Sequence, residues 1–135
     1  RETGKPIMVD FTGYGCVNCR KMEQFVWSVP EVERIIEEDY ILVSLYVDDR
    51  QKLPKEEQHR YTTSTGNPKD IITIGDRWST LEAETFHKVS QPWYALISTD
   101  GKLLNAPVGT SSVDEFKAFL ECGLQGMEEL KKEGK

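Results

Sequence analysis

The sequence has few cysteines, no long hydrophobic run and no excess of basic residues. Three cysteines in 135 residues are too few for a disulfide framework, and an odd number leaves at least one unpaired. No apolar stretch approaches the roughly 20 residues of a membrane-spanning helix, so we expect no direct insertion into a membrane. The net charge of -6 argues against a nucleic-acid partner, because phosphate binding needs clustered Lys and Arg.

The length and composition are those of one globular domain. Charged residues make up 30% and hydrophobic residues 38% of the chain. A chain of 135 residues can form a hydrophobic core that is stable without disulfides or bound metals. We see no internal repeat and expect a single domain over residues 1–135. The first residue is Arg1 and not Met, so we expect a processed or trimmed chain whose missing signal peptide says little about its compartment.

Two of the cysteines form a Cys-x-x-Cys motif, Cys16 to Cys19. This motif has two main uses, zinc ligation and dithiol redox chemistry. A zinc site needs about four ligands, and the remaining candidates Cys122, His59 and His87 have no ligand-like spacing. We therefore expect no metal and no organic cofactor, and favour redox chemistry over a zinc module or two packed free cysteines.

The residues around the pair predict a strand followed by a helix. Ile7–Phe11 has the pattern of a buried strand. Apolar residues recur at helical spacing after the pair, at Met22, Phe25, Val26 and Val29. Cys16 then stands at a helix N-terminus, which stabilises a thiolate, and Cys19 lies one turn later, partly beneath it. We predict Cys16 as the nucleophile and Cys19 as the resolving thiol.

Two acidic residues near the pair are candidates for proton transfer. Asp10 interrupts an apolar strand, where burial would raise its pKa and let it exchange protons with Cys19 through water. The alternative is a solvated, exposed strand position. Glu23 lies four residues after Cys19 and hence on the same helix face. Its alternative is a surface Glu paired with a nearby Arg or Lys.

The middle of the chain predicts a second helix, a long strand and an insertion. Pro30 fits the first turn of a helix. Tyr40–Val47 is almost continuously apolar, which is typical of a central strand covered on both faces. Residues 49–90 are polar and irregular. Within them we expect a short helix after Pro54, a loop over 62–68 and a helix that carries Trp78, Leu81, Phe86 and Val89.

The C-terminal part predicts a hairpin and a last helix. Asp100-Gly101 is a hairpin signal between strands at 94–98 and 102–105. Ser112 and Glu115 form a capping box for a helix with a buried stripe at Val113, Phe116, Leu120 and Leu124. Cys122 falls outside that stripe, so we expect it to be partly exposed and uninvolved in the chemistry.

Gln91 and Pro92 precede the first strand of that hairpin. A proline there can simply mark the strand boundary. A cis Gln91–Pro92 bond would instead expose backbone groups on which an extended peptide can dock.

These residues together resemble the thioredoxin superfamily. Val9-Asp10-Phe11 precedes a Cys-x-x-Cys, with the acid six residues before the first cysteine, and Pro92 stands where the family has its cis-proline. The resemblance implies an α/β, thioredoxin-like fold with a central mixed β-sheet flanked by helices. The insertion, about residues 49–90, then precedes the cis-proline strand. It could shape partner choice or be a surface decoration.

Within the superfamily, three segments look most like the C-terminal periplasmic domain of the DsbD thiol:disulfide interchange family: Lys5–Phe11, Cys16–Glu23 and Gln91–Tyr94. The resemblance implies a periplasmic reductase that relays electrons from a membrane-embedded partner domain to protein thiols and disulfides, including those of cytochrome c maturation. It also favours roles for Asp10 and Glu23. The uncharged Val17 and Asn18 favour a reductase too, but an isomerase or oxidase, or a non-catalytic binding or zinc module, stays open.

One departure concerns substrate access. Thioredoxins usually have Trp directly before the first cysteine, whereas this chain has Gly15 there and Tyr14 one position earlier. We expect wider access to Cys16, with Tyr14 as an aromatic wall. The predicted substrate-binding residues are Tyr14, Gly15, Gln91 and Pro92.

Overall fold

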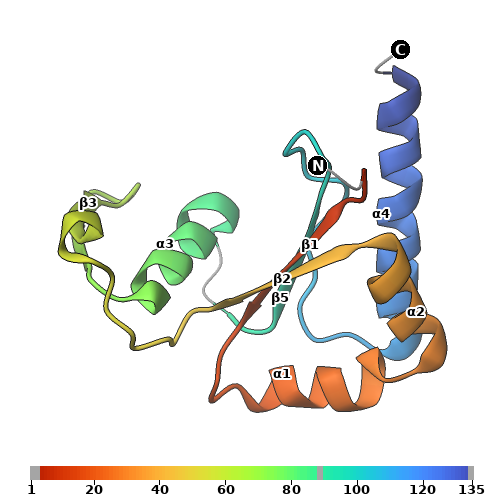
Figure 1. Cartoon of the computed structure of the whole chain (residues 1–135), viewed down its shortest axis with the longest axis horizontal. Coiled ribbons are helices and arrows are strands. Elements are labelled where there is room, and N and C mark those ends of the chain that lie inside the picture. Colours follow the sequence, from red (N-terminus) through yellow and green to blue (C-terminus); the bar gives the residue numbers. More distant parts are fainter. Residues whose placement is uncertain (1–3, 88–89, 134–135) are drawn as a thin grey trace.

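Three strands form a mixed sheet in the computed structural model, which describes residues 4–87 and 90–133 (Figure 1). The elements in chain order are β1 (Ile7–Thr12), α1 (Val17–Met22), the π-helix η1 (Glu23–Trp27), α2 (Pro30–Asp39), β2 (Ile41–Tyr46), the 3-10 helix η2 (Lys55–Glu57), β3 (His59–Thr62), β4 (Pro68–Ile71), α3 (Ile74–Phe86), β5 (Trp93–Ile97) and α4 (Val113–Glu133). The central strand is β1, which runs parallel to β2 and antiparallel to β5. The predicted α/β class with a helix-flanked mixed sheet is confirmed.

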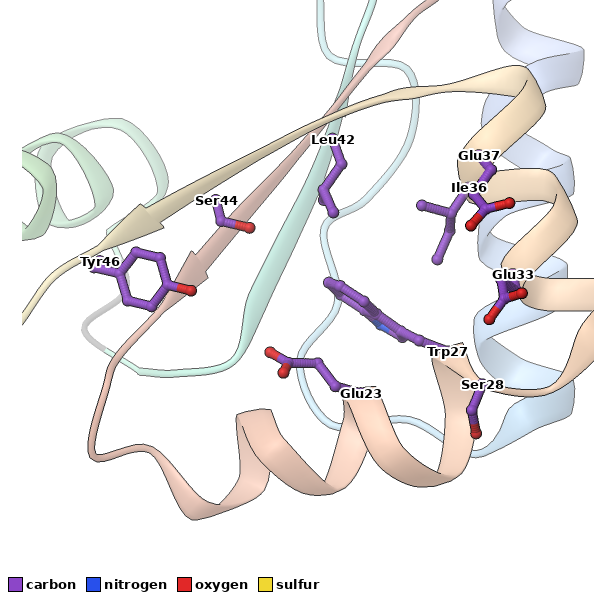
Figure 2. A pocket seen from close by; sticks show the side chains of 9 residues that line it. All are labelled: Glu23, Trp27, Ser28, Glu33, Ile36, Glu37, Leu42, Ser44 and Tyr46. Carbon is purple, nitrogen blue, oxygen red and sulfur yellow. The ribbon is translucent and has the colours of Figure 1, made fainter.

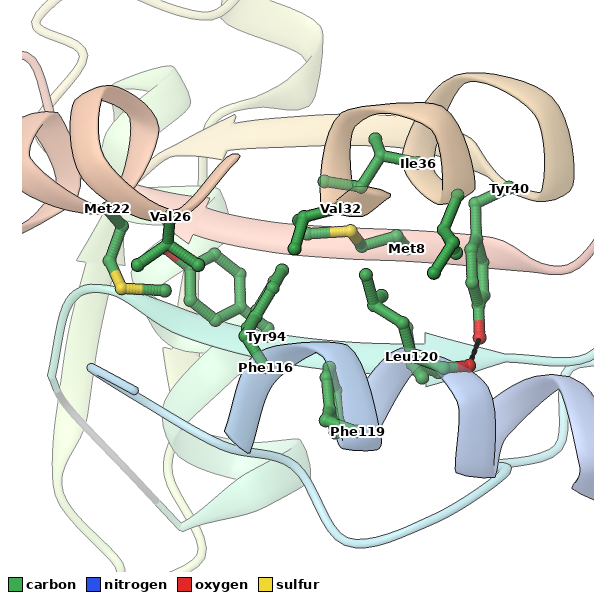
Figure 3. Close-up of a cluster of buried hydrophobic side chains, with 12 residues drawn as sticks. Met8, Met22, Val26, Val32, Ile36, Tyr40, Tyr94, Phe116, Phe119 and Leu120 are labelled. Atoms are coloured by element: carbon green, nitrogen blue, oxygen red, sulfur yellow. Dashed lines mark hydrogen bonds between the residues drawn. The ribbon is translucent and has the colours of Figure 1, made fainter. Parts of the chain in front are cut away.

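The main core lies between one face of the sheet and the helices α1, α2 and α4 (Figure 3). Met8 on β1 and Leu96 on β5 are fully buried there. The helices contribute Met22, Val26, Val32, Ile35, Ile36, Phe116, Phe119 and Leu120. Tyr40 closes the far end of the core, because its hydroxyl donates a 2.7 Å hydrogen bond to the backbone carbonyl of Leu120. The second and last helices begin as predicted, with Pro30 in the first turn of α2 and the Ser112–Glu115 capping box before α4.

The prediction that the long apolar strand at Tyr40–Val47 is a central strand covered on both faces is wrong. Among the described residues β2 pairs with β1 alone and lies at one end of the sheet order β2-β1-β5. Leu42 and Val43 are exposed. A continuous apolar run therefore does not distinguish a central strand from an edge strand, since both favour β-branched and aliphatic residues.

The helix after the cysteine pair changes its winding along its length. It starts as α1 and continues as the π-helix η1. Met22 and Val26 are buried, as their spacing predicts, but Phe25 is exposed. A π-turn is wider than an α-turn, so it rotates the following side chains away from the positions that a 3.6-residue period gives them.

The insertion is more regular than predicted. The predicted loop over 62–68 is present at residues 63–67, but it joins two strands that were not predicted, β3 and β4, which pair antiparallel. The short helix after Pro54 is a single 3-10 turn, and the expected later helix is α3. Val89 lies outside the described residues. Helix α3 and the hairpin lie beyond the end of the main sheet, away from α2 and α4 (Figure 1).

The predicted hairpin after β5 forms only in part. Ser98 N donates to the carbonyl of Lys102 and Leu104 N to that of Leu96, at 2.8 and 2.9 Å. The segment 102–105 makes only an isolated bridge from Leu103 to Ile97 and is not a full strand. Cys122 on α4 is exposed, as expected.

Candidate functional site

Three loops meet at one edge of the sheet. The register places Thr12, the last residue of β1, beside Tyr46, the last residue of β2. It also places Phe11 beside Trp93, the first residue of β5. The segments that follow β1, follow β2 and precede β5 therefore leave the sheet side by side. They contain the Gly13–Cys16 loop, Asp48 and Pro92, respectively.

The cysteine pair stands at the junction of the first loop with α1. Cys16 and Cys19 form a disulfide with their Cα atoms 5.3 Å apart. Cys16 is the N-cap residue of α1, and its Sγ accepts a 3.2 Å hydrogen bond from the backbone N–H of Cys19. Cys16 is partly exposed, whereas only 1% of Cys19 is exposed. The predicted arrangement of an outer and an inner cysteine is confirmed, and their roles in catalysis stay predictions.

The loop before Cys16 is held from the end of β2. The backbone N–H groups of Tyr14 and Gly15 donate to the two carboxylate oxygens of Asp48, at 2.9 and 3.1 Å. The Tyr14 ring stacks on Tyr46 with centroids 4.2 Å apart. Tyr14 remains 64% exposed, so it can offer its other face to a partner as the predicted aromatic wall.

Arg20 ties the start of the helix to the end of β1. Its guanidinium donates to the Thr12 hydroxyl and to the Gly13 carbonyl, both at 3.0 Å. It also forms an ion pair with Glu23 at 3.3 Å. The ion pair that the alternative predicted for Glu23 is therefore present, and a role of Glu23 in proton transfer stays a prediction.

Asp10 is buried beneath the site, with 2% of its surface exposed. It lies in a row across the sheet between Ser44 on β2 and Tyr94 on β5. The Ser44 hydroxyl donates to Oδ2 at 3.2 Å, and Oδ1 accepts no hydrogen bond from any residue that the structure describes. The predicted burial is confirmed and the solvated alternative is wrong.

The environment of Asp10 favours its protonated form. Burial raises its pKa from 3.8 to about 7, because an anion there loses its hydration. The Ser44 hydrogen bond lowers the pKa, the negative charge of Glu23 raises it, and the positive charge of Arg20 lowers it. The result is a carboxyl group that can take or give a proton near neutral pH.

A pocket of about 470 Å³ opens between the helices η1 and α2 and the strand β2 (Figure 2). Glu23 and Trp27 line it from η1, and Ser44 and Tyr46 line it from β2. Ser44 thus contacts both the pocket and Asp10. Glu23 is the charged residue that the pocket and the surroundings of Asp10 have in common.

The loop before β5 contains a cis Gln91–Pro92 bond, the possibility that the sequence left open. Pro92 is buried and Gln91 is half-buried. The Gln91 side chain donates a 3.0 Å hydrogen bond to the carboxylate of Glu82, which is fully buried on α3. Close by on the same helix, the Phe86 ring packs edge-on against Phe11 of β1 at 5.7 Å. The end of the insertion is thereby joined to both β1 and the proline loop.

Sequence reasoning missed four residues that shape this site: Arg20, Ser44, Asp48 and Glu82. Of the four, Asp48 was the easiest to predict from the sequence. The ends of parallel strands share a sheet edge, and an acid directly after one strand faces the loop that follows the neighbouring strand. Ser44 and Glu82 depend on the strand register and on the fold of the insertion, for which the sequence carried no local signal.

Two general features concern ligands and membranes. Across residues 4–87 and 90–133, no group of three or more His, Cys, Asp or Glu side chains is placed to hold a metal ion. None of the described helices combines the length and the hydrophobicity of a membrane span.

Comparisons with known proteins agree with the fold. The family model that describes a thioredoxin-like domain matches residues 1–123 of this chain. A thioredoxin from Thermus thermophilus is 21% identical, with a TM-score of 0.57 over 89% of this chain and 74% of that one. The oxidoreductase DsbH is 20% identical, with a TM-score of 0.57 over 90% and 74%. The DsbD C-terminal domain of Neisseria meningitidis in its reduced form is 16% identical, with a TM-score of 0.53 over 89% and 83%. No curated protein matches the sequence.

Proposed function

The chain belongs to the thioredoxin-like family, and on that premise we propose that it is a thiol:disulfide reductase that relays electrons through Cys16 and Cys19. The observation that carries the proposal is the disulfide between a partly exposed and a buried cysteine at a helix start, beside a cis-proline loop. The family match supports the dithiol chemistry. The direction of electron flow is part of the proposal.

The reaction begins with the reduced pair. The Cys16 thiolate attacks one sulfur of a partner disulfide, the partner's S–S bond breaks, and its other sulfur leaves as a thiolate that takes up a proton. Cys19 then loses its proton and attacks Cys16, which releases the second partner thiol and closes the Cys16–Cys19 disulfide. The partner gains two electrons, which the cysteine pair gives up. A donor dithiol restores the pair by the reverse sequence.

Asp10 is proposed to accept the proton of Cys19. A pKa of about 7 lets the carboxyl group bind and release a proton over the pH range in which thiols react. The pocket beside Ser44 supports a water-mediated route from the solvent, with Glu23 at its rim. Glu23 acts in this proposal through its negative charge, which raises the pKa of Asp10.

Partner binding is proposed to involve two of the loops at this sheet edge, the loop that leads into Cys16 and the cis-proline loop. Tyr14 and Gly15 form one wall, and Tyr14 offers an exposed aromatic ring. Gln91 and Pro92 form the other, where backbone groups can pair with an extended peptide strand. The Gln91 side chain is engaged with Glu82, so its backbone and not its amide is the proposed contact.

We further propose an extracytoplasmic, periplasmic setting. The support is the resemblance of three sequence segments to the DsbD family and the fold similarity to a DsbD C-terminal domain. In that setting the electron donor is a membrane-embedded domain, and the acceptors are protein disulfides, including those of cytochrome c maturation.

The reduction of insulin disulfides tests the reductase activity. Cys16→Ser should lower the rate more than about 1,000-fold, because the other cysteine of the pair, Cys19, is buried and Cys122 lies on α4. Cys122→Ser is the matched control and should keep the wild-type rate, since Cys122 is exposed on α4. Full activity in Cys16→Ser would contradict the proposal. A reduction potential near -120 mV, that of a strong oxidant such as DsbA, would favour an oxidase instead.

A further inference from the structure

Asp48 holds the loop that leads into the nucleophilic cysteine, although it lies 32 residues away in sequence. Each of its carboxylate oxygens accepts one backbone N–H, from Tyr14 and from Gly15. A Cβ on Gly13 would come within 3.1 to 3.3 Å of the same carboxylate, so glycine there permits the close approach. Val47 N donates to the Thr12 carbonyl at 2.9 Å and anchors the preceding residue to β1.

The carboxylate of Asp48 is ionised at neutral pH. Asp48 is exposed, and the desolvation that it still undergoes acts to raise its pKa, but the hydrogen bonds from Tyr14 and Gly15 and the positive charge of Arg20 outweigh desolvation, so the pKa lies below its ordinary value. Because Gly15 directly precedes Cys16, chain geometry puts the anion within about 10 Å of the Cys16 sulfur. That distance is comparable to the Debye length at physiological ionic strength.

Further charged groups near the cysteine pair are on the helix and on β1. Arg20 supplies one positive charge, and it is already paired with Glu23. Burial raises the pKa of Asp10 to about 7, so its carboxyl group carries only part of a negative charge near neutral pH. Asp48 therefore adds a negative charge that no ion pair cancels among the described residues, on the side of the pair where a thiolate forms.

We propose that Asp48 is a positioning residue with two effects: it fixes the Gly13–Gly15 loop, and its charge opposes ionisation of the Cys16 thiol. A thiolate that is less stabilised makes the reduced pair a better electron donor, since a stabilised thiolate favours the reduced form. The inference deepens the proposed reductase function and rests on it. It assigns part of the control of thiol reactivity to the end of β2, outside the Cys-x-x-Cys motif.

The pH dependence of Cys16 alkylation tests the charge effect. The reduced full chain is treated with iodoacetamide, and modification of Cys16 is followed by peptide mass spectrometry. Asp48→Asn should raise the thiolate fraction below the thiol pKa up to about twofold, the effect of one charge about 10 Å away at an effective dielectric constant of about 20 with physiological screening. Asp48→Glu keeps the charge and should show the same pH dependence of Cys16 alkylation as the wild-type chain.

The matched control is Asp49→Asn, which removes the neighbouring acid. The Asp49 carboxylate accepts from Gln51 N and not from the loop before Cys16, so its removal should leave the alkylation profile unchanged. Identical profiles for Asp48→Asn and the wild-type chain would overturn the inference. An equal shift in Asp49→Asn would overturn its assignment to Asp48.

The positioning effect has its own measurement. Asp48→Ala removes both acceptors and should raise KM for a protein disulfide about threefold to tenfold, while Asp48→Asn, which keeps one carbonyl acceptor, should raise it less. Equal KM values for Asp48→Ala and the wild-type chain would overturn this part. Failure of the proposed function is distinguishable, because it appears as reductase activity that survives Cys16→Ser, whatever the alkylation profiles of the Asp48 variants.

Discussion

Two buried carboxyl groups flank the redox site, and they differ in how their surroundings use them. Asp10 lies on β1, with one hydrogen bond from Ser44 and one oxygen without a described donor. Glu82 lies on α3 and receives the side-chain amide of Gln91 from the cis-proline loop. Both are almost completely shielded from solvent. Burial alone therefore does not identify a proton-transfer group.

The difference lies in what each carboxyl group is joined to. Asp10 stands beside a solvent-accessible pocket and near Glu23, whose charge opposes its ionisation. Glu82 fixes the position of a loop. We expect removal of the Asp10 carboxyl to relieve an unfavourable charge, and removal of the Glu82 carboxyl to loosen the structure.

The largest expected effect is a gain in stability in Asp10→Asn above pH 7. The pKa of Asp10 is higher in the folded than in the unfolded chain, so the folded protein holds an extra proton between about pH 4 and pH 7. Its contribution to stability falls as the pH rises through that window, by about 4 kcal/mol in total. Urea unfolding of the oxidised protein should find Asp10→Asn more stable at pH 8 by several kcal/mol, and much less so at pH 4.

A matched control for this pH dependence is Asp100→Asn, which changes an exposed acid in the turn after β5. Its difference from the wild-type chain should be small at both pH values. A difference for Asp10→Asn that is the same at pH 4 and pH 8 would contradict the account of Asp10. Asp10→Asn should also reduce insulin about 10- to 100-fold more slowly than the wild-type chain near neutral pH, if Asp10 accepts the Cys19 proton.

The next effect has the opposite sign. Glu82→Ala should lower the free energy of unfolding by about 3 kcal/mol, because it leaves a cavity and deprives the Gln91 amide of its acceptor. Glu82→Gln keeps the volume and one carbonyl oxygen, so its loss should be smaller. Equal stabilities of Glu82→Ala and the wild-type chain, measured by urea unfolding, would show that Glu82 does not anchor the loop.

The smallest expected effect concerns the pKa of Asp10 itself. Glu23→Gln removes a nearby negative charge and should lower that pKa by less than about one unit. NMR titration of the Asp10 carboxyl carbon measures the shift in the oxidised protein. Glu33→Gln, on α2 and lining the same pocket, is the control and should produce a smaller shift. A larger shift of the Asp10 pKa in Glu33→Gln than in Glu23→Gln would contradict the proposed role of Glu23 in proton transfer.

The sequence allowed the redox pair and its strand to be predicted because their signals are local. An acid in an apolar strand, a glycine turn and two cysteines at helical spacing lie within Asp10–Cys19. The helical spacing predicted an inner position for Cys19, and the apolar neighbours of Asp10 favoured its burial over a solvated position, which the structure then decided. The cis bond at Pro92 was expected only through the resemblance to a family.

The residues that depend on long-range placement could not be predicted in the same way. Asp48 meets Tyr14 and Gly15 only because β1 and β2 pair in parallel with their ends in register. Glu82 meets Gln91 only because α3 folds back onto the proline loop. The apolar run of β2 indicated a strand but not its place in the sheet, since edge and central strands share that composition.

The central claim is that Cys16 attacks the disulfide of a partner protein, and trapping of the mixed disulfide tests it most directly. Cys19→Ser removes the resolving thiol, so the reduced variant mixed with a disulfide-containing protein should accumulate a covalent complex. Peptide mass spectrometry should find that complex linked through Cys16. A complex linked through Cys122, or none where the wild-type chain reduces the same protein, would contradict the account.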